Sequence, residues 1–467
     1  MTTQQHLLDR AYGFSPNNVL KRATATNLVY ALQPAALTFS HRLPSNDDPH
    51  TRIPAHVAGV NALAIDRFEG RYLLSGGADS SIAIWDLEAA TTSTESGDTQ
   101  LPLSAVNKTA KEHKLGITQV DFYPFDSLAF LTSSYDHTVK LYSSETLQAS
   151  AAFDLDAVVY NIALSPIASH LLVACATQGP NVRLVDLRSG ATTHSLAGHA
   201  GAVLSTAWSP VTEHLLASGA TDGTVRFWDI RRSVGSLGSL DLEDSVGRTA
   251  APSHSYTHAQ SRTQAHRGAV NGIAWTEDAR HLVTTGHDQR IRVWDTATYA
   301  NTLANFGPTV KNSGLAPIIP LLPPRHHFPA HADTMFFPNE HEMLFYELFD
   351  GKLLRRMRRP EPAKRAVDIA AAAAAGAGAN GPKGTRNTRD RITSLAWRAH
   401  DVELYSAHAD GSIVAWKPRT EEDEDADEEA RVEELERDEG RKRKRDVLED
   451  IYRGLTKRNV TFGNMGV

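Results

Sequence analysis

The sequence holds a single cysteine, Cys175, among 467 residues, which excludes an intrachain disulfide framework and favours a reducing compartment, the cytosol or the nucleus. It also lacks long hydrophobic runs: no stretch approaches the ~18 consecutive apolar residues that a membrane span requires. The first residues, MTTQQHLLDRAYGF, have neither the basic nor the apolar region of a secretory signal. The net charge of -7 argues against a globally basic nucleic-acid binder. These shortages predict a soluble protein with no membrane partner.

Charge is concentrated near the C-terminal end. Residues 421–440 contain thirteen acidic residues against two arginines, and the next five residues are all basic. Charge blocks of this kind repel themselves, so we expect a disordered acidic and basic tail over 421–467. The basic cluster is either a solvated charge run or a nuclear localisation signal, because a short exposed basic cluster fits an acidic groove on an import receptor. The second hypothesis rests on Arg441, Lys442, Arg443, Lys444 and Arg445.

Internal repeats are the strongest pattern in the chain. Five segments each combine a short apolar strand, a turn with an aspartate, and an alternating strand that ends in an aromatic residue. The aspartate precedes the aromatic by six residues and follows a hydroxyl side chain by four, and a histidine precedes it by 22 or 23 residues in four of the five. In chain order the sets are His56, Ser75, Asp79 and Trp85; His113, Thr132, Asp136 and Tyr142; His199, Ser218, Asp222 and Trp228; His266, Thr284, Asp288 and Trp294; and Ser406, Asp410 and Trp416.

This pattern predicts an all-β fold, a WD40 β-propeller in which each repeat forms one blade. The spacing has a physical reason, because the four side chains can form a buried hydrogen-bond relay. The aspartate in the turn accepts from the histidine, and the hydroxyl joins the histidine to the indole nitrogen of the tryptophan. A buried relay stabilises only when every member is satisfied, which fixes residue type and spacing together.

Two further units raise the expected number of blades to seven. Residues 158–188 match in frame, but Gly179, Cys175 and Val185 stand where the aspartate, the hydroxyl and the tryptophan belong. The other unit spans 314–359 and has no evident relay residue. Its expected strands include residues 317–322, 334–338 and 342–349.

The predicted domain plan has three parts, a helical segment, the propeller and the charged tail, at 1–48, 49–420 and 421–467. Short helices are predicted at 3–13 and 17–33. The outermost strand of the last blade should come from the N-terminal side, near HTRIP (50–54), and close the ring. Three insertions rich in small or polar residues are predicted to be flexible loops, at 89–110, 234–262 and 361–388.

A catalytic reading of the relay would be a hydrolase triad such as Ser75, His56 and Asp79. The trio recurs in several blades at the same spacing, however, and one active site needs no copies. No GxSxG nucleophile elbow accompanies it, so we interpret the relay as structural. GAGANG (376–381) matches a dinucleotide-binding loop, but it follows an alanine run and precedes Pro382, which is typical of a linker. We therefore predict neither an enzyme nor a cofactor.

Two other clusters invite a chemical interpretation. The histidines His326, His327 and His331 have no cysteine or acidic partner spaced to complete a zinc site, so we interpret them as surface residues and predict no metal. The basic stretch RRMRRP (355–360) could contact nucleic-acid phosphates, but a solvated strand end is the interpretation we favour. What remains is a rigid platform whose rim loops bind partner proteins.

Several segments go beyond the general WD40 pattern and resemble one family, the Cockayne syndrome group A (CSA) WD-repeat proteins. The resemblance runs in order along more than half of the chain. Its most specific detail is the Gly-Pro-Asn turn at 179–181, where most WD40 repeats have an aspartate. The similar segments are FEGRYLLSGGADSSIAIWDLE (68–88), DFYPFDSLAFLTSSYDHTVKLYSSETLQ (121–148), HLLVACATQGPNVRLVDLRSG (170–190), NTLANFG (301–307) and LYSAHADGSIVAW (404–416).

The resemblance implies a noncatalytic substrate receptor of a cullin 4 ubiquitin ligase that acts in transcription-coupled nucleotide excision repair in the nucleus. The implied partners are the DDB adaptor, through it cullin 4 and a RING subunit, stalled RNA polymerase II, and a repair factor of the Cockayne syndrome group B type. No direct sequence-specific nucleic-acid contact is expected. The implied adaptor contacts are Arg188 and Arg231, in VDLR and WDIR endings, and the helical residues Leu7, Leu8, Val19 and Leu20.

Two alternatives stay open. Each arginine of the VDLR and WDIR endings could instead pair within its own blade. The chain could also be a scaffold for chromatin or ribosome assembly, because WD40 rings serve there without a ligase.

Overall fold

The computed structural model describes residues 17–42, 54–94, 97–106, 112–167, 169–232, 235–242, 264–314, 316–328, 333–359, 391–398 and 400–419. The chain divides into two compact units, Met1–Lys417 and Pro418–Val467, and only two residues of the second unit are described. Apart from the last residue of the final strand, all strands belong to the first unit. No helix within the described ranges is long and apolar enough to cross a membrane.

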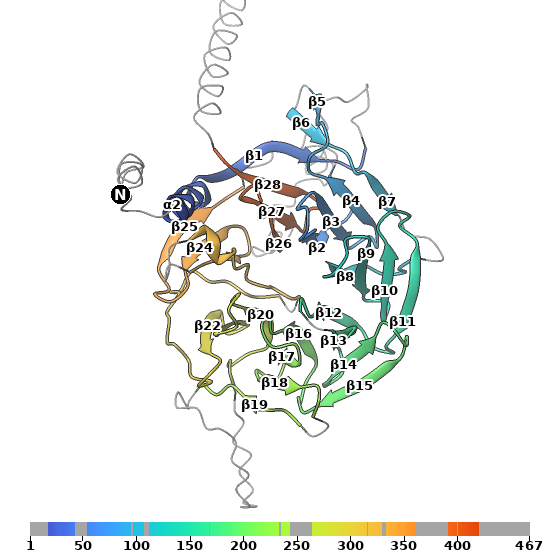
Figure 1. Cartoon of the computed structure of the whole chain (residues 1–467), viewed down its shortest axis with the longest axis vertical. Coiled ribbons are helices and arrows are strands. Elements are labelled where there is room, and N and C mark those ends of the chain that lie inside the picture. Colours follow the sequence, from blue (N-terminus) through green and yellow to red (C-terminus); the bar gives the residue numbers. More distant parts are fainter. Residues whose placement is uncertain are drawn as a thin grey trace, which may run out of the picture. The chain divides into compact units, whose positions relative to one another are not determined.

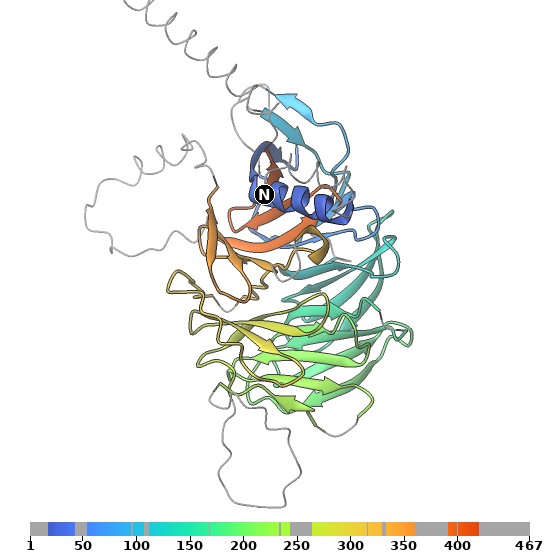
Figure 2. The ribbon, with the colours of Figure 1, turned by 60° about the vertical axis from the view of Figure 1, so that its left-hand side comes forward.

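Seven sheets stand around a common axis as the blades of a propeller (Figure 1). Within each blade, consecutive strands pair antiparallel and the chain moves outward from the axis. The first strands of neighbouring blades therefore lie next to each other around the axis. Figure 2 shows the ring turned, with the sheets of successive blades packed against one another.

The strands of the first four blades are β2 (Val60–Ile65), β3 (Tyr72–Gly77), β4 (Ile82–Asp86) and β7 (Ser104–Val106); β8 (Ile117–Phe122), β9 (Ala129–Ser134), β10 (Thr138–Ser143) and β11 (Ala149–Asp154); β12 (Val159–Leu164), β13 (Leu172–Thr177), β14 (Asn181–Asp186) and β15 (Thr192–Ala197); and β16 (Val203–Trp208), β17 (Leu215–Ala220), β18 (Val225–Asp229) and β19 (Gly238–Ser239). Blades five to seven contain β20 (Val270–Trp275), β21 (His281–Gly286) and β22 (Arg290–Asp295); β23 (Thr334–Pro338), β24 (Met343–Glu347) and β25 (Leu353–Met357); and β26 (Ile392–Arg398), β27 (Glu403–His408), β28 (Ile413–Pro418) and β1 (Leu32–Phe39).

Neighbouring blades are held together by apolar side chains between their sheets. Leu74 of blade one packs in one cluster with Val120 and Phe130 of blade two, and none of the three is more than 1% exposed. Burying one such side chain contributes about 1.5–3 kcal/mol. The fit is close, because a Cβ at Gly76 would lie 2.7 Å from the Cγ2 atom of Ile117 in the next blade.

The ring closes with β1, which pairs beside β28 as the outer strand of blade seven, and not with residues 50–54. The predicted closing strand was therefore wrong, and residues 50–53 lie outside the described ranges. Packing explains the choice. Phe39 of β1 is 3% exposed, and its ring contacts Trp85 and Tyr405, with centroids 5.2 and 6.1 Å away. The propeller thus takes in residues that the sequence had assigned to the helical segment.

The insertion at 89–110 is a second correction, because it contains strands where a flexible loop was predicted. β5 (Thr92–Thr94) and β6 (Gly97–Gln100) form a hairpin, and β6 pairs parallel with β1, so that blade seven gains two outer strands. Gln100 is 4% exposed and donates from Nε2 to the Asp86 carbonyl at 2.7 Å. Of the 234–262 insertion, residues 235–242 are described and include β19, whereas 361–388 lies outside the described ranges.

Blade six has the predicted inner, second and third segments, but its inner segment is irregular. It makes one isolated bridge, from Leu321 to Phe336 of β23. Pro317 and Pro320 have no N–H groups for a ladder, which accounts for the irregularity. Blade five is also reduced, since its outer segment is a bridge from Asn301 to Trp294.

One helix, α2 (Asn17–Tyr30), precedes β1 and agrees with the predicted helix at 17–33 except at its end. The helix is tied to blade six. Thr26 Oγ1 donates to the His327 carbonyl at 2.7 Å in the short 3-10 helix η1 (Arg325–His327), and Arg355 Nη1 donates to the Tyr30 carbonyl at 2.7 Å. The other predicted helix, at 3–13, lies outside the described residues.

Candidate functional site

The ring has two rims with different content. We letter the strands of each blade A to D from the axis outward. Because consecutive strands are antiparallel, the A–B and C–D connections lie at one end of the ring, the A–B rim, and the B–C and D–A connections lie at the other, the B–C rim. The relay residues predicted from the sequence lie below the B–C rim, and the predicted adaptor-binding arginines lie on the A–B rim.

The relay geometry is clearest in blade four. Trp228 Nε1 donates to Ser218 Oγ at 2.7 Å, and the same oxygen lies 2.7 Å from His199 Nε2. All three side chains are buried. Blades one and five repeat this arrangement with Trp85, Ser75 and His56 and with Trp294, Thr284 and His266.

The link from histidine to aspartate takes two forms. In blade five it is direct, because His266 Nδ1 lies 3.0 Å from Asp288 Oδ1. In blade four His199 Nδ1 lies 2.8 Å from the hydroxyl of Thr224, which donates to Asp222 at 2.7 Å. Blade two has the direct form and blade one the hydroxyl form, through His113 and Asp136 and through His56, Ser81 and Asp79.

Hydrogen bonding sets the charge state of these aspartates. Burial raises the pKa of Asp288, but the hydrogen bond from His266 and the charge of Arg292 outweigh it and hold that pKa well below its usual range. Burial lowers the pKa of His266 and keeps the ring neutral, although Asp288 partly opposes the effect. The pKa is also held low at Asp79, Asp136 and Asp222, where burial is again outweighed by hydrogen bonds.

Blade seven completes its relay with a residue that the sequence pattern did not reveal. Trp416 Nε1 donates to Ser406 Oγ at 2.9 Å, but no histidine precedes the blade at the usual spacing. His408, two residues along the same strand, lies with Nε2 3.1 Å from Ser406 Oγ instead. Asp410 accepts from Arg359 Nη1 at 2.7 Å. The signal was a histidine inside the strand, outside the spacing used in the search.

Blades two and three depart in other ways. The Tyr142 hydroxyl of blade two donates to the Glu112 carboxylate and not to the strand hydroxyl. In blade three Cys175 and Val185 are fully buried in one apolar cluster, and burial raises the pKa of the Cys175 thiol to about 12. Apolar packing therefore replaces the relay in this blade.

The relay geometry is unsuited to nucleophilic chemistry. Ser75 is fully buried, and its Oγ accepts from Trp85 and contacts His56, so no substrate can reach it. Among the described side chains, no group of three or more His, Cys, Asp or Glu is placed to hold a metal ion.

The structure differs in part from our interpretation of the histidine cluster and the basic stretch. His327 is 5% exposed, so it is not a surface residue, whereas His326 beside it is exposed. Of the basic stretch 355–360, Arg355 donates to the Leu32 carbonyl at 2.8 Å. Arg358 and Arg359 form ion pairs with Glu342 and Asp410. Arg355 and Arg359 therefore link blade six to blade seven, whereas Arg356 and Arg358 are exposed, so the solvated strand end is correct for only part of the stretch. His331, 376–381 and the cluster from Arg441 to Arg445 lie outside the described residues.

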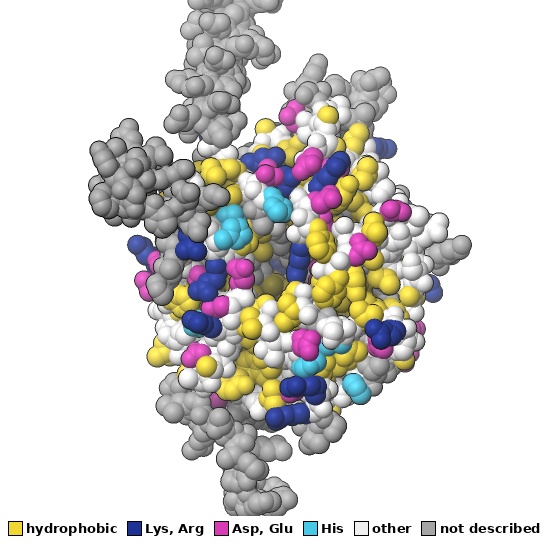
Figure 3. Space-filling view, in the orientation of Figure 1, with side chains coloured by type: hydrophobic (Ala, Val, Ile, Leu, Met, Phe, Trp, Pro, Cys, Tyr) yellow, Lys and Arg dark blue, Asp and Glu magenta, His cyan; other side chains and the backbone are white. Residues whose placement is uncertain are grey.

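The A–B rim carries exposed apolar side chains in four consecutive blades. Figure 3 views the ring from this rim and shows hydrophobic side chains gathered beside the central opening over blades one to three. We call the exposed residues of the A–B connections the apolar arc; they are Phe68 (51% exposed), Phe125 (46%), Leu128 (54%), Ile167 (45%) and Val211 (59%). Contiguous apolar surface rimmed by polar residues is typical of a protein-binding face.

The two predicted arginines lie on the same rim, in the C–D connections of blades three and four. Arg231 Nε and Nη2 donate to the two carboxylate oxygens of Asp229 at 3.1 and 3.0 Å, and the side chain remains 65% exposed. Arg188 is exposed, and its backbone N–H donates to Asp186 at 3.0 Å. The local pairing considered from the sequence is thus present at Arg231, with the guanidinium still open to solvent.

The adaptor contacts predicted in the helical segment are described only in part. Leu7 and Leu8 lie outside the described residues. Val19 and Leu20 lie in the first turns of α2, but their side chains are outside the described set.

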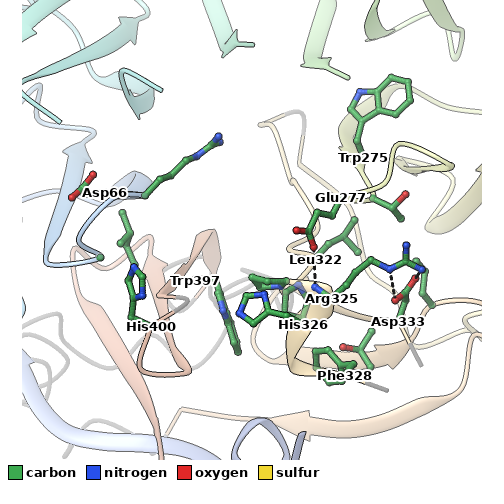
Figure 4. A pocket seen from close by; sticks show the side chains of 18 residues that line it. Asp66, Trp275, Glu277, Leu322, Arg325, His326, Phe328, Asp333, Trp397 and His400 are labelled. Atoms are coloured by element: carbon green, nitrogen blue, oxygen red, sulfur yellow. Dashed lines mark hydrogen bonds and ion pairs between the residues drawn. The ribbon is translucent and has the colours of Figure 1, made fainter. Parts of the chain in front are cut away.

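A cavity of about 580 Å³ opens on the A–B rim between blades five, six, seven and one (Figure 4). Trp275, Trp397 and Phe328 contribute aromatic walls. Its charged residues include Arg325, whose side chain donates to Asp333 at 3.0 Å and also pairs with Asp278. The cavity therefore offers both apolar surface and fixed charges to a partner.

Trp397 is one of the residues lining this cavity that have a buried polar atom without a hydrogen-bond partner among the described residues. At the equivalent positions, Trp208 and Trp275 donate at 3.0 Å to the carbonyls of Ala163 and Ala207 in the preceding blade. The Trp397 Nε1 atom is buried without an acceptor among the described residues. No carbonyl of blade six among the described residues accepts from it. The sequence did not indicate this position, because Trp397 occupies the same place in its strand as Trp208 and Trp275 do in theirs.

Comparison with known proteins agrees with the fold. The ring of seven blades and its buried relays define a WD40-repeat β-propeller, and the profile of the WD domain, G-beta repeat family matches residues 48–86, 105–143, 190–229 and 258–295. The matched segments are blades one, two, four and five, in which the relay histidine precedes the blade at the usual spacing. The chain belongs to the WD40-repeat family.

Two groups of relatives stand out. The chain is 30% identical over 433 residues to WD repeat-containing protein ATCSA-1 of Arabidopsis thaliana, and the match covers 78% of this chain and 87% of that protein. It is 27% identical over 274 residues to the ribosome biogenesis protein ytm1 of Neurospora crassa, covering 52% of this chain and 55% of that protein. The match to ytm1 of Aspergillus fumigatus is of the same extent.

Proposed function

We propose that this chain is a noncatalytic substrate receptor of a cullin 4 ubiquitin ligase and that it docks on the DDB adaptor through its A–B rim. The observation that carries the proposal is the apolar arc, which places exposed side chains of four consecutive blades on one face. The similarity to ATCSA-1 over 87% of that protein supports it. In this role the chain acts in the nucleus in transcription-coupled nucleotide excision repair.

The rim has the composition that stable interfaces use. Interfaces of standard size bury roughly 1,200–2,000 Å² in total, with aromatic and arginine residues as the main anchors. Phe68 and Phe125 supply aromatic anchors, and the cavity beside Trp397 accepts a protruding side chain with a hydrogen-bond acceptor. A partner carbonyl at Trp397 would satisfy the indole N–H that blade six leaves unpaired.

Arg231 is the polar contact that we expect to matter most. Its bidentate contact with Asp229 fixes the guanidinium before binding, which lowers the entropy lost when an adaptor carboxylate approaches. Because 65% of the side chain is exposed, the remaining N–H groups can donate to that carboxylate. We propose the N-terminal residues as a further docking segment; of these, α2 is hydrogen-bonded to η1 on the A–B rim.

A pull-down from nuclear extract, read by mass spectrometry, tests this assignment. The wild-type chain should recover the DDB adaptor, cullin 4 and the RING subunit, and Arg231→Ala should recover at least roughly fivefold less, as the loss of one charged hydrogen bond predicts. Arg280→Ala is the matched control, because Arg280 is an 80% exposed arginine on the same rim that also pairs with an aspartate. Equal recovery by all three proteins would contradict the role of Arg231.

A scaffold of ribosome assembly is the second candidate. The similarity to two ytm1 ribosome biogenesis proteins over about half of the chain favours it. The same experiment separates the candidates: recovery of ribosome assembly factors without a cullin by the wild-type chain would replace the receptor with the scaffold.

A further inference from the structure

A second cavity, of about 440 Å³, lies in the central channel toward the B–C rim, away from the apolar arc. The first strands of blades one, two and seven line it, together with the inner segment of blade six. Its wall is apolar where residues 316–321 cross the channel, and Leu63 and Leu395 continue that surface. The polar lining includes Tyr135, Gln119 and Arg391.

Arg391 stands at a position that is otherwise small or apolar. In six blades the residue just before the A strand accepts a hydrogen bond at its carbonyl from the residue one position past the B strand, so the six positions are equivalent. In blade seven this bond runs from the Ala409 N–H to the Arg391 carbonyl at 2.8 Å. The residues at the other five positions are Gly59, Gly116, Val158, Ala202 and Ala269.

The space available to a side chain differs between these positions. At Gly59, a Cβ would lie 2.8 Å from the Ala409 carbonyl of the preceding blade, so that turn leaves no room for a side chain. The Arg391 guanidinium instead lies against Gly314, where a Cβ would be 2.0 Å from Nη1. A side chain at 314 would therefore displace the guanidinium from this position.

The guanidinium has no hydrogen bond or ion pair with any described residue, and its Nη2 atom is buried. Glu340 attracts it electrostatically but is not within ion-pair distance, and the Glu340 carboxylate accepts from Ser313 at 2.6 Å. Burial lowers the pKa of Arg391, which reflects a cation that has lost water without gaining an anion. Buried charges are otherwise paired or hydrogen-bonded, so this one is an exception.

The rest of the cavity completes a site for negative charge. No carboxylate lines it, in contrast to the cavity on the A–B rim, where Asp66, Glu277 and Asp333 balance the arginines. Burial raises the pKa of Tyr135, so its hydroxyl stays protonated and can donate a hydrogen bond.

We propose that this cavity binds an oxyanion carried on a peptide segment of a partner protein, with Arg391 as the receptor of the negative charge. The oxyanion is the carboxylate of an acidic residue or the phosphate of a phosphorylated one. The apolar wall at 316–321 packs against the neighbouring part of the segment, and this selects a peptide over a bare ion. The site lies on the rim opposite the apolar arc and goes beyond adaptor docking, on which it does not depend.

Isothermal titration calorimetry on the purified full chain at low ionic strength tests the site with three probes: O-phosphoserine, N-acetylglutamate α-amide and inorganic phosphate. Arg391→Ala should weaken binding of the first two at least roughly tenfold, as expected for a charge-assisted hydrogen bond. Alanine stands at two equivalent positions, so the fold should tolerate it, and thermal unfolding checks this. Arg391→Lys keeps the charge and should retain part of the affinity. Arg267→Ala removes an exposed arginine on the same rim and should bind as the wild type does.

The outcomes separate the possible sources of the anion. Tighter binding of O-phosphoserine supports a phosphorylated segment, and tighter binding of the glutamate derivative supports an acidic one. Inorganic phosphate that binds as tightly as both derivatives would overturn the peptide, because the amino-acid part of the derivatives would then contribute nothing. Equal affinities in the wild type and Arg391→Ala, or no binding to the wild type, would overturn the site. None of these results bears on adaptor recovery, which is measured on the other rim.

Discussion

Blades four and three are neighbours with the same backbone pairing, yet they are stabilised differently. In blade four, Ser218 joins Trp228 and His199 in a buried relay. In blade three, Cys175 occupies the equivalent position, and the site is filled by apolar contacts. The comparison teaches that the repeated residues report how a blade is built and say little about what the ring binds. The features that suggest binding lie outside the repeated residues, in turns and at single positions that differ from their equivalents in other blades.

From this comparison we expect the largest loss of stability when the relay hydroxyl on the second strand of blade four is removed. Ser218→Ala removes one oxygen and leaves the Trp228 indole and the His199 ring without a buried partner, so the free energy of unfolding should fall by about 2–4 kcal/mol. The matched change Cys175→Ala also removes one γ atom but breaks no relay, and should cost about 1 kcal/mol. Urea unfolding of both variants measures the difference. Equal losses would show that the relay adds nothing beyond packing.

A second prediction concerns pH and blade five. The pKa of His266 is lowered in the folded state, so its contribution to stability is complete above the ordinary histidine pKa near 6.5 and declines as the pH falls below it. The pKa of Asp288 is also lowered, and its contribution is complete above about pH 4 and declines below it. The propeller should therefore weaken in two stages on acidification.

His266→Gln tests the first stage. The variant should be less stable than the wild type at pH 7.5, and the difference in the free energy of unfolding should shrink between pH 6.5 and pH 5, because glutamine takes up no proton. Urea unfolding of the variant and the wild type across this pH range measures the difference. A difference that stays constant with pH would contradict the neutral state of His266.

The smallest predicted effect is the difference in stability loss between variants of two tryptophans at equivalent positions of their blades. Trp275→Phe breaks the hydrogen bond to the Ala207 carbonyl and should cost about 1 kcal/mol more than Trp397→Phe, because Trp397 has no such bond to lose. Thermal unfolding of the two variants measures the difference. Equal losses would indicate that Trp397 has an acceptor in solution.

Much of the ring follows from the sequence because its relays demand particular residues at fixed spacing. The four tryptophan relay pairs and the blade order are predictable for this reason. β1 was missed because closure of the ring depends on packing between distant segments, here Phe39 against Trp85 and Tyr405, which no local pattern reveals. The strands in 89–110 were missed because the Thr and Ser residues there also suit a loop.

The candidate binding features were harder to predict than the fold. The sequence indicated Arg188 and Arg231 through a resemblance, whereas the apolar arc comes from single residues in turns that show no periodicity. Arg391 and Trp397 stand out only when their contacts are compared with those of equivalent residues in the other blades. An unpaired donor or cation is a property of the neighbours, and the chain's own pattern does not contain it.

The most direct test of the account measures the affinity of the purified DDB adaptor for the chain by surface plasmon resonance, with Phe125→Ser and Val211→Ser combined in one variant. Both residues are exposed, so the fold should be unaffected, and Val57→Ser, at a 79% exposed residue of the B–C rim, is the control. The account predicts that the double variant binds at least roughly tenfold more weakly, as expected for loss of interface anchors, and that Val57→Ser binds as the wild type does. Unchanged affinity in the double variant, or an equal loss in Val57→Ser, would contradict docking through the A–B rim.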